Sequence, residues 1–225
     1  MTPQEPRLRV EDLQVSIQSV RILRGVALAV QPGQLAGLMG RNGAGKTTLL
    51  RSVMGLLPWK QGRIELDGEP LRGLPAHARA RLGIGYMPED RRLIPQLTVE
   101  ENVLVPAWAT GLEGRAARLA GIYRLIPEVQ AIRERKALQL SGGQQKLVAL
   151  ARALMCGTRL LLLDEPFEGV APVLARRLVE VIGQLKGQGA SVILAESDAS
   201  PNRGLVDAVF TIDRGAIEPA APTGG

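Results

Sequence analysis

The chain has 225 residues, enough for one large domain or for a core with an inserted lobe. Hydrophobic residues make up 45 % of it and aromatic residues only 3 %, so aliphatic side chains must fill the core, as in α/β proteins with a parallel sheet. The single cysteine excludes an internal disulfide framework. The net charge of +6 comes without a recognisable nucleic-acid-binding module, so we expect no nucleic acid partner.

The first part of the sequence predicts an antiparallel pair of strands, because residues 8–15 and 26–30 alternate apolar and polar side chains. A turn at 31–34 then leads into an apolar strand over Leu35–Met39. The elements expected after it alternate between helix and strand: a helix ending near Gly55, a short strand over 63–68, a helix over 77–81 and a strand over 83–87.

The pattern becomes helical from residue 98 to about residue 135, and Thr98 and Glu101 mark a helix start. The elements expected after it are an amphipathic helix ending at Met155, a buried strand over 159–163, a helix over 173–186, a buried strand over 191–195 and a last strand over 208–212. No stretch approaches the roughly 20 apolar residues of a membrane-spanning helix.

Residues 40–47 read G-R-N-G-A-G-K-T, a complete phosphate-binding loop between a strand and a helix. Glycines allow several backbone N–H groups to point at one phosphate chain, and the helix N-terminus adds positive potential. We expect Lys46 to reach the β- and γ-phosphates and the Thr47 hydroxyl to bind Mg²⁺. The sequence therefore predicts that the chain binds a nucleoside triphosphate.

A second motif is the aliphatic run Leu160–Leu163 followed by Asp164 and Glu165. Such a run predicts a buried strand that delivers two carboxylates to the edge of the sheet where ligands bind. Asp164 is then expected to hold Mg²⁺ beside Thr47, and Glu165 to act as the general base on the attacking water.

A third motif, Leu140-Ser141-Gly142-Gly143-Gln144, stands directly before a helix. Its exposed backbone N–H groups at a helix N-terminus would form a second anion site. One nucleotide does not need two phosphate cradles, so this site is expected to serve a nucleotide bound to a partner subunit.

In this order the three motifs resemble those of the nucleotide-binding subunits of ATP-binding cassette (ABC) transporters, and the resemblance covers residues 8 to about 218. It implies an α/β fold of the P-loop NTPase class, with a RecA-like core, a small antiparallel β portion and an inserted helical lobe. The expected bounds are about 1–88 and 151–225 for the core lobe and about 89–150 for the helical lobe. Guanine-nucleotide enzymes are disfavoured because no N-K-x-D motif occurs.

A finer resemblance comes from two stretches, 85–92 with 97–102 and 164–172. Both look like the second ATPase of branched-chain amino acid importers and their amide and urea relatives. Most cassette ATPases carry Gln where Glu89 stands and Asp where Ala171 stands, and this subgroup typically departs from both. The resemblance implies a peripheral protein on the cytoplasmic face of a bacterial inner membrane. Its partners would be a second ABC ATPase, in a homo- or heterodimer, two permease subunits contacted near 88–98, and an extracytoplasmic solute-binding protein.

Three departures from the general family pattern weaken the expectation of full ATPase activity. The aromatic residue that stacks on adenine should fall near Ile17, the switch histidine is replaced by Ser197, and Glu89 replaces a glutamine that senses Mg²⁺ and water. The residues that the resemblance assigns to ATP are Gly40, Asn42, Gly43, Ala44, Gly45, Lys46, Thr47, Thr48 and Ile17. Those assigned to Mg²⁺ are Thr47, Asp164 and Glu89, those assigned to catalysis are Glu165, Ser197 and Glu89, and those assigned to the partner's ATP are Ser141, Gly142, Gly143 and Gln144.

The expected function is that of the ATP-hydrolysing subunit of an importer for branched-chain amino acids or related small polar solutes. The departures leave a nucleotide-gated partner subunit open, and they suggest an asymmetric heterodimer in which this chain's own site is the weaker one. A cassette ATPase without a transport role is the other alternative.

Overall fold

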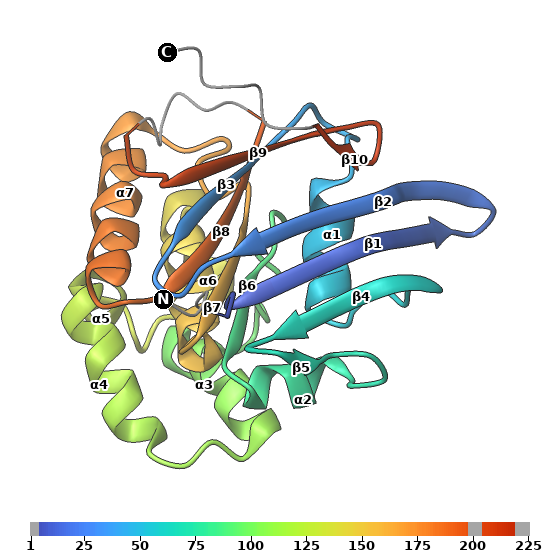
Figure 1. Ribbon diagram of the computed structural model, residues 1–225. Coiled ribbons are helices and arrows are strands. Elements are labelled where there is room, and N and C mark those ends of the chain that lie inside the picture. The colour runs from blue at the N-terminus through green and yellow to red at the C-terminus, as the bar shows by residue number, and fades with distance from the viewer. Residues whose placement is uncertain (1–4, 198–203, 219–225) are drawn as a thin grey trace.

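The computed structural model describes residues 5–197 and 204–218. In that part of the chain the strands form two sheets (Figure 1). The antiparallel sheet has the order β2-β1-β4-β5, with β1 (Leu8–Ile17), β2 (Val20–Val30), β4 (Gln61–Leu66) and β5 (Glu69–Pro70). The larger sheet has the order β10-β9-β3-β8-β7-β6, with β3 (Leu35–Met39), β6 (Ile84–Met87), β7 (Leu160–Asp164), β8 (Ser191–Glu196), β9 (Ala208–Asp213) and β10 (Ala216–Ile217). All its neighbouring strands run parallel except the pair β9 and β10.

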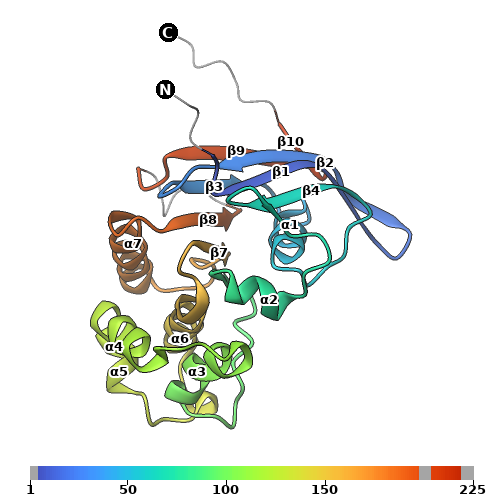
Figure 2. The same cartoon turned by 60° about the horizontal axis from the view of Figure 1, so that its bottom comes forward.

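The helices lie in two places. Helix α1 (Lys46–Val53) lies behind the antiparallel strands in Figure 1, and α2 (Ala76–Arg81) lies near β5. The remaining helices gather on the opposite side of the parallel strands (Figure 2): α3 (Val99–Thr110), α4 (Arg115–Leu125), α5 (Pro127–Ala131), α6 (Gly142–Cys156) and α7 (Pro172–Gly187). A short 3₁₀ helix, η1 (Ala137–Gln139), precedes α6.

Strand β7 shows why its sequence is continuously aliphatic. Leu160 and Leu162 pack with α1 and the antiparallel sheet, whereas Leu161 and Leu163 pack with the helices on the other face. A parallel strand covered on both faces must be apolar at every position, because successive side chains point to opposite sides. The parallel pairing places the carboxyl ends of β3, β7 and β8 side by side, and Asp164 at the end of β7 contacts Thr47 at the start of α1.

The α/β architecture and nearly every predicted element are confirmed. The first two strands are longer than expected, reaching Ile17 and starting at Val20, and the two-residue strands β5 and β10 were not predicted. The division into lobes at residues 88 and 150 stays a prediction, and the ends of the expected core lobe, 1–4 and 219–225, lie outside the described residues. No helix in the described part of the chain is long and apolar enough to cross a membrane.

Five arginines lie between residues 72 and 92, and not all of them are exposed to solvent. Arg79 is only 2 % exposed, and its guanidinium donates to four backbone carbonyls, among them those of Ser52 and Val53 at the end of α1. Burial lowers the pKa of Arg79 to about 10. Arg79 and Arg72 also lie over the ring of Trp59, at 4.9 and 5.7 Å from its centroid. Arg79 therefore packs α2 against α1.

Candidate nucleotide site

The loop between β3 and α1 is shaped by its glycines. Gly45 has φ 117°, a left-handed conformation that L side chains rarely adopt. A Cβ at Gly40 would lie 2.3 Å from the carbonyl oxygen of Ile212, so only glycine fits beside β9. The loop begins at the carboxyl end of β3 and ends at the N-terminus of α1, whose unpaired N–H groups favour an anion.

Lys46 lies at the floor of a cavity of about 390 Å³ beside this loop. Its side chain is 5 % exposed, and Nζ donates to the Gly40 carbonyl at 2.6 Å. The same Nζ lies 3.0 Å from Oε1 of Glu165, which is also buried. The cavity is lined by Ile22, Asn42, Gly43, Gly45, Lys46, Thr47, Thr48, Glu89 and Glu165, most of which the sequence assigned to ATP.

Thr47 and Asp164 are joined by a hydrogen bond beside the phosphate-binding loop. The Thr47 hydroxyl donates to Oδ1 of Asp164 at 3.1 Å, and the Tyr86 hydroxyl donates to Oδ2 at 3.1 Å. Burial raises the pKa of Asp164 above its usual range. No cluster of three or more metal-ligating side chains occurs among residues 5–197 and 204–218. This sparse set of oxygens fits Mg²⁺ that arrives with a nucleotide, because Mg²⁺ usually takes one or two protein carboxylates and completes its shell with phosphates and water.

Glu165 follows β7 in a strained conformation, with φ 47°. Its N–H donates to the Ala195 carbonyl at 2.9 Å, and its Oε2 accepts from the N–H and the hydroxyl of Ser197 at 3.2 and 3.4 Å. Ser197 therefore touches the carboxylate that the sequence assigned as general base. Ser197, which we predicted at the position of the switch histidine, thus contacts this part of the site.

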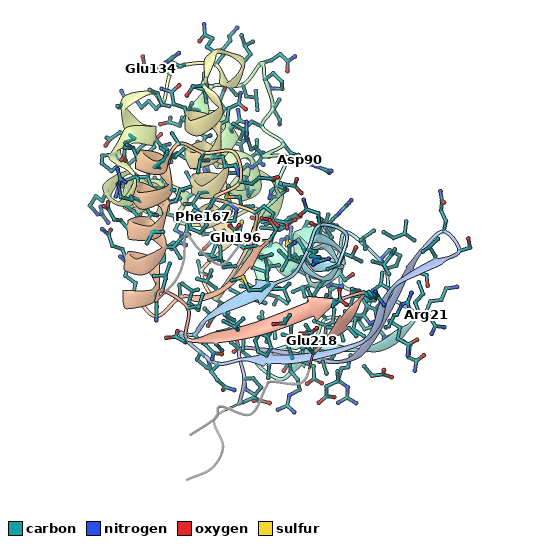
Figure 3. The ribbon with its side chains drawn as sticks, turned by 90° about the horizontal axis from the view of Figure 1, so that it is seen from above. Arg21, Asp90, Glu134, Phe167, Glu196 and Glu218 are labelled. Atoms are coloured by element: carbon teal, nitrogen blue, oxygen red, sulfur yellow. The ribbon has the colours of Figure 1, made fainter. Side chains whose placement is uncertain are left out.

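Two buried charged groups beside Glu165 were not predicted, Glu196 and Lys146. Glu196 is 3 % exposed and accepts from the N–H of Phe167 at 3.2 Å; Figure 3 shows the two residues where the helices meet the parallel strands. Burial and the neighbouring Glu165 carboxyl raise the pKa of Glu196 to about 9. Glu196 could have been predicted in the same way as Asp164, because each is an acidic residue at the end of a buried apolar strand.

Glu89 lines the nucleotide-loop cavity and also a second, larger cavity of about 530 Å³. Glu89 is an exposed residue of the loop that joins β6 to α3, and desolvation of its carboxyl group and the nearby Glu168 raise its pKa. Its carboxyl group therefore lies where the two cavities adjoin.

The Ser141–Gln144 motif forms the start of α6. Ser141 accepts from the N–H of Gln144 at 3.3 Å, and the Gln144 side chain accepts from the N–H of Ser141 at 3.1 Å, a reciprocal cap. None of the residues Ser141, Gly142, Gly143 and Gln144 lines the cavity at the phosphate-binding loop. The Ser141–Gln144 motif is therefore separate from that cavity, and its role beside a partner's nucleotide stays a prediction.

Ile17 lies at the end of β1, paired with Val20, and 42 % of it is exposed. Ile17 is not among the residues that line the nucleotide-loop cavity. Ile22, on the neighbouring strand β2, does line it. The role of Ile17 beside adenine stays a prediction.

A family model described as "ABC transporter" matches residues 23–168 of the chain, a stretch that includes all three motifs. The chain belongs to the ABC transporter family. It is 36 % identical over 198 residues to the high-affinity branched-chain amino acid transport ATP-binding protein BraG of Pseudomonas aeruginosa, covering 88 % of this chain and 85 % of that protein. It is also 34 % identical to the lipopolysaccharide export system ATP-binding protein LptB of Haemophilus influenzae, covering 93 % of this chain and 88 % of LptB.

Solved structures agree with this assignment. A nucleotide-free ATP-binding cassette from an ABC transporter superposes with a TM-score of 0.83 at 26 % identity, covering 95 % of this chain and 90 % of that one. The ADP conformation of a cassette superposes with a TM-score of 0.82 at the same identity, covering 95 % and 89 %. The predicted P-loop NTPase fold is confirmed, and the chain is the ATP-binding, ATP-hydrolysing subunit of an ABC transporter.

Proposed function

We propose that this ABC ATPase powers the import of branched-chain amino acids or related small polar solutes. The observation that carries the proposal is the likeness to BraG over most of both chains. The departures at Glu89 and Ala171, which are typical of this subgroup of importers, support it independently. The likeness to LptB keeps an export role as the competing outcome of the test.

In the proposed reaction, ATP enters the cavity at the phosphate-binding loop. The loop N–H groups and Lys46 would bind the phosphates, while Thr47 and Asp164 would hold Mg²⁺, which when bound neutralises charge on the phosphate oxygens. Lys46 must then leave Glu165, 3.0 Å away, for the phosphates. The freed Glu165 carboxylate, still held by Ser197, can accept the proton of the attacking water.

The separation of the two anion sites supports a head-to-tail dimer. Ser141–Gln144 of this chain would complete the site of a second ABC ATPase, and the partner's equivalent residues would complete the site at Lys46. We propose a sister ATPase as the partner. The competing arrangement is an asymmetric heterodimer in which this chain's own site is the weaker one, because Ile17, Glu89 and Ser197 depart from the general family pattern.

The second cavity, of about 530 Å³, supports contact with permease subunits. It lies where α1, β6, α3 and α6 meet, and apolar side chains such as Met54, Leu56, Val105 and Pro106 line part of it. Short helices of two permeases would dock here and along residues 88–98, which would hold this ATPase at the cytoplasmic face of a bacterial inner membrane. A solute-binding protein on the other side would deliver the solute.

Uptake measurements test the proposal. Cells that lack the gene should lose high-affinity uptake of labelled leucine, isoleucine and valine, or of urea and short amides. The wild-type gene should restore uptake, whereas Glu165→Gln should not. If uptake of all these solutes is unchanged while lipopolysaccharide accumulates in the inner membrane, an export role replaces the proposed one.

A further inference from the structure

Lys146 brings a charged side chain into the interior of the protein. It lies in the first turns of α6, shortly after the Ser141–Gln144 motif, and is 1 % exposed. Burial and the nearby Arg91 guanidinium lower the pKa of its ammonium group. A buried cation is costly unless it has strong partners, so its contacts indicate why the chain keeps it.

The partner of Lys146 is the backbone of the predicted general base. Nζ donates to the carbonyl oxygen of Glu165 at 2.6 Å, a charge-assisted hydrogen bond. The same carbonyl accepts from the N–H of Glu168 at 3.2 Å, which closes a turn. Because Glu165 is held at φ 47°, a conformation unfavourable for a residue with a side chain, a strong bond to its carbonyl helps to keep it there.

The surroundings of Lys146 add a second link to the same segment. Glu165 and Glu168 stabilise its charged form electrostatically. Glu196 accepts from the N–H of Phe167. The turn over 165–168 is thus held by Lys146 from α6 and by Glu196 from β8, with both groups buried.

We propose that Lys146 is a positioning residue for ATP hydrolysis, whose ammonium group fixes the Glu165 peptide so that the carboxylate points at the nucleotide site. The proposal rests on the assignment of Glu165 as general base and is independent of the transported solute. It also gives α6 two tasks. The N-terminus of this helix serves the partner's nucleotide, and its next turn holds the base that acts on the chain's own nucleotide.

Steady-state ATP hydrolysis tests the proposal, measured for the full chain and for the chain with its partner ATPase. Lys146→Met keeps the length of the side chain but donates no hydrogen bond. It should lower kcat by about tenfold while KM for ATP stays within about twofold, since only positioning in the transition state is lost. Lys146→Gln keeps a shorter, neutral hydrogen-bond donor, so its kcat should lie between those of Lys146→Met and wild type. The exposed Lys60→Met is the matched control and should change nothing.

Melting temperatures separate positioning from a purely structural role. Lys146→Met removes a desolvated charge but also one hydrogen bond, to a carbonyl that still accepts from the N–H of Glu168, so it should melt only a few degrees lower than wild type and stay folded at the assay temperature. Wild-type kcat in Lys146→Met overturns the proposal, and so does a fall in kcat that comes with a higher KM for ATP or with unfolding at the assay temperature. Glu165→Gln is measured in parallel. Full ATP hydrolysis by Glu165→Gln overturns the assignment of Glu165 as the base. If Glu165→Gln is inactive but Lys146→Met is fully active, only the role of Lys146 is overturned.

Discussion

At the scale of single residues, the predicted base is embedded in a group of buried charges. Lys46, Lys146, Glu165 and Glu196 are each at most 5 % exposed and lie around the ends of β7 and β8. The parallel register explains why Glu165 and Glu196 lie close together. Asp164 of β7 pairs with Ala195 of β8, and the residue after each of them is a glutamate. Lys146 and Glu196 have shifted pKa values, and buried groups with shifted pKa values are typical of a reaction site.

Glu196 should make the stability of the folded chain depend on pH. Its pKa is raised in the folded chain from an unfolded value of roughly 4.3, so the folded chain binds the extra proton and stability falls as pH rises above that value. Glu196→Gln does not titrate and keeps an acceptor for the N–H of Phe167. We expect its free energy of unfolding, relative to wild type, to increase by on the order of 2 kcal/mol between pH 5 and pH 8 and to level off above about pH 9.

Thermal unfolding of both proteins across this range measures the effect. Glu113→Gln, which removes an exposed carboxyl group in the loop between α3 and α4, is the control and should follow the wild-type curve. A difference between Glu196→Gln and wild type that stays constant from pH 5 to pH 9 would show that Glu196 has an ordinary pKa.

Ile17 is the second prediction at this scale. If it occupies the position of the adenine-stacking aromatic residue, Ile17→Tyr should tighten ATP binding about fivefold, the equivalent of about 1 kcal/mol from an aromatic stack. Val20→Tyr, on the residue paired with Ile17 and 60 % exposed, is the matched control and should leave the affinity unchanged. Fluorescence titration with an ATP analogue measures both. Tightening by Ile22→Tyr instead would move the adenine site to the residue that lines the cavity.

At the scale of elements, α6 is held so close to the parallel sheet that β6 needs a glycine. A Cβ at Gly85 would lie 2.2 Å from the carbonyl oxygen of Ala153, so Gly85→Ala must push α6 away from β6. We expect a loss of about 2–3 kcal/mol in the free energy of unfolding, the usual cost of overpacking. ATP hydrolysis should fall as well, because α6 carries both the Ser141 motif and Lys146.

The control is Gly121→Ala in α4, where the nearest atom to a new Cβ would be 3.7 Å away. This change should be neutral or stabilise by up to about 1 kcal/mol, because alanine favours a helix interior. Denaturant unfolding of the two variants tests the pair. Equal stabilities would mean that α6 can shift without cost.

The elements also show what could be predicted from the sequence and what could not. The strands and helices that carry the motifs were predictable because their hydrophobic patterns are long and because each motif marks the boundary of a strand or a helix. Strands β5 and β10 have two residues each, too few for any periodicity to show. Lys146 was hidden for a different reason: a charge within an amphipathic helix is expected on the solvent face, and only the packed structure turns it toward Glu165.

At the scale of the whole molecule, the fold brings Lys46, Thr47, Asp164 and Glu165 into one site but leaves the Ser141 motif elsewhere on the chain. We therefore expect a single chain to hold most of one site and a small part of another. Two cassettes related head to tail would complete both, and closing or opening that pair is the motion that ATP binding and hydrolysis could transmit to the permeases.

The central claim is that this chain's own site hydrolyses ATP. The most direct test is the rate of ATP hydrolysis by the chain, alone and with its partner ATPase, for wild type, Glu165→Gln and Ser141→Arg. Loss of the base should lower the turnover of this site at least about a hundredfold in both settings, with ATP still bound. If the pair instead loses activity with Ser141→Arg and barely responds to Glu165→Gln, the claim is contradicted, and the chain serves mainly to complete its partner's site.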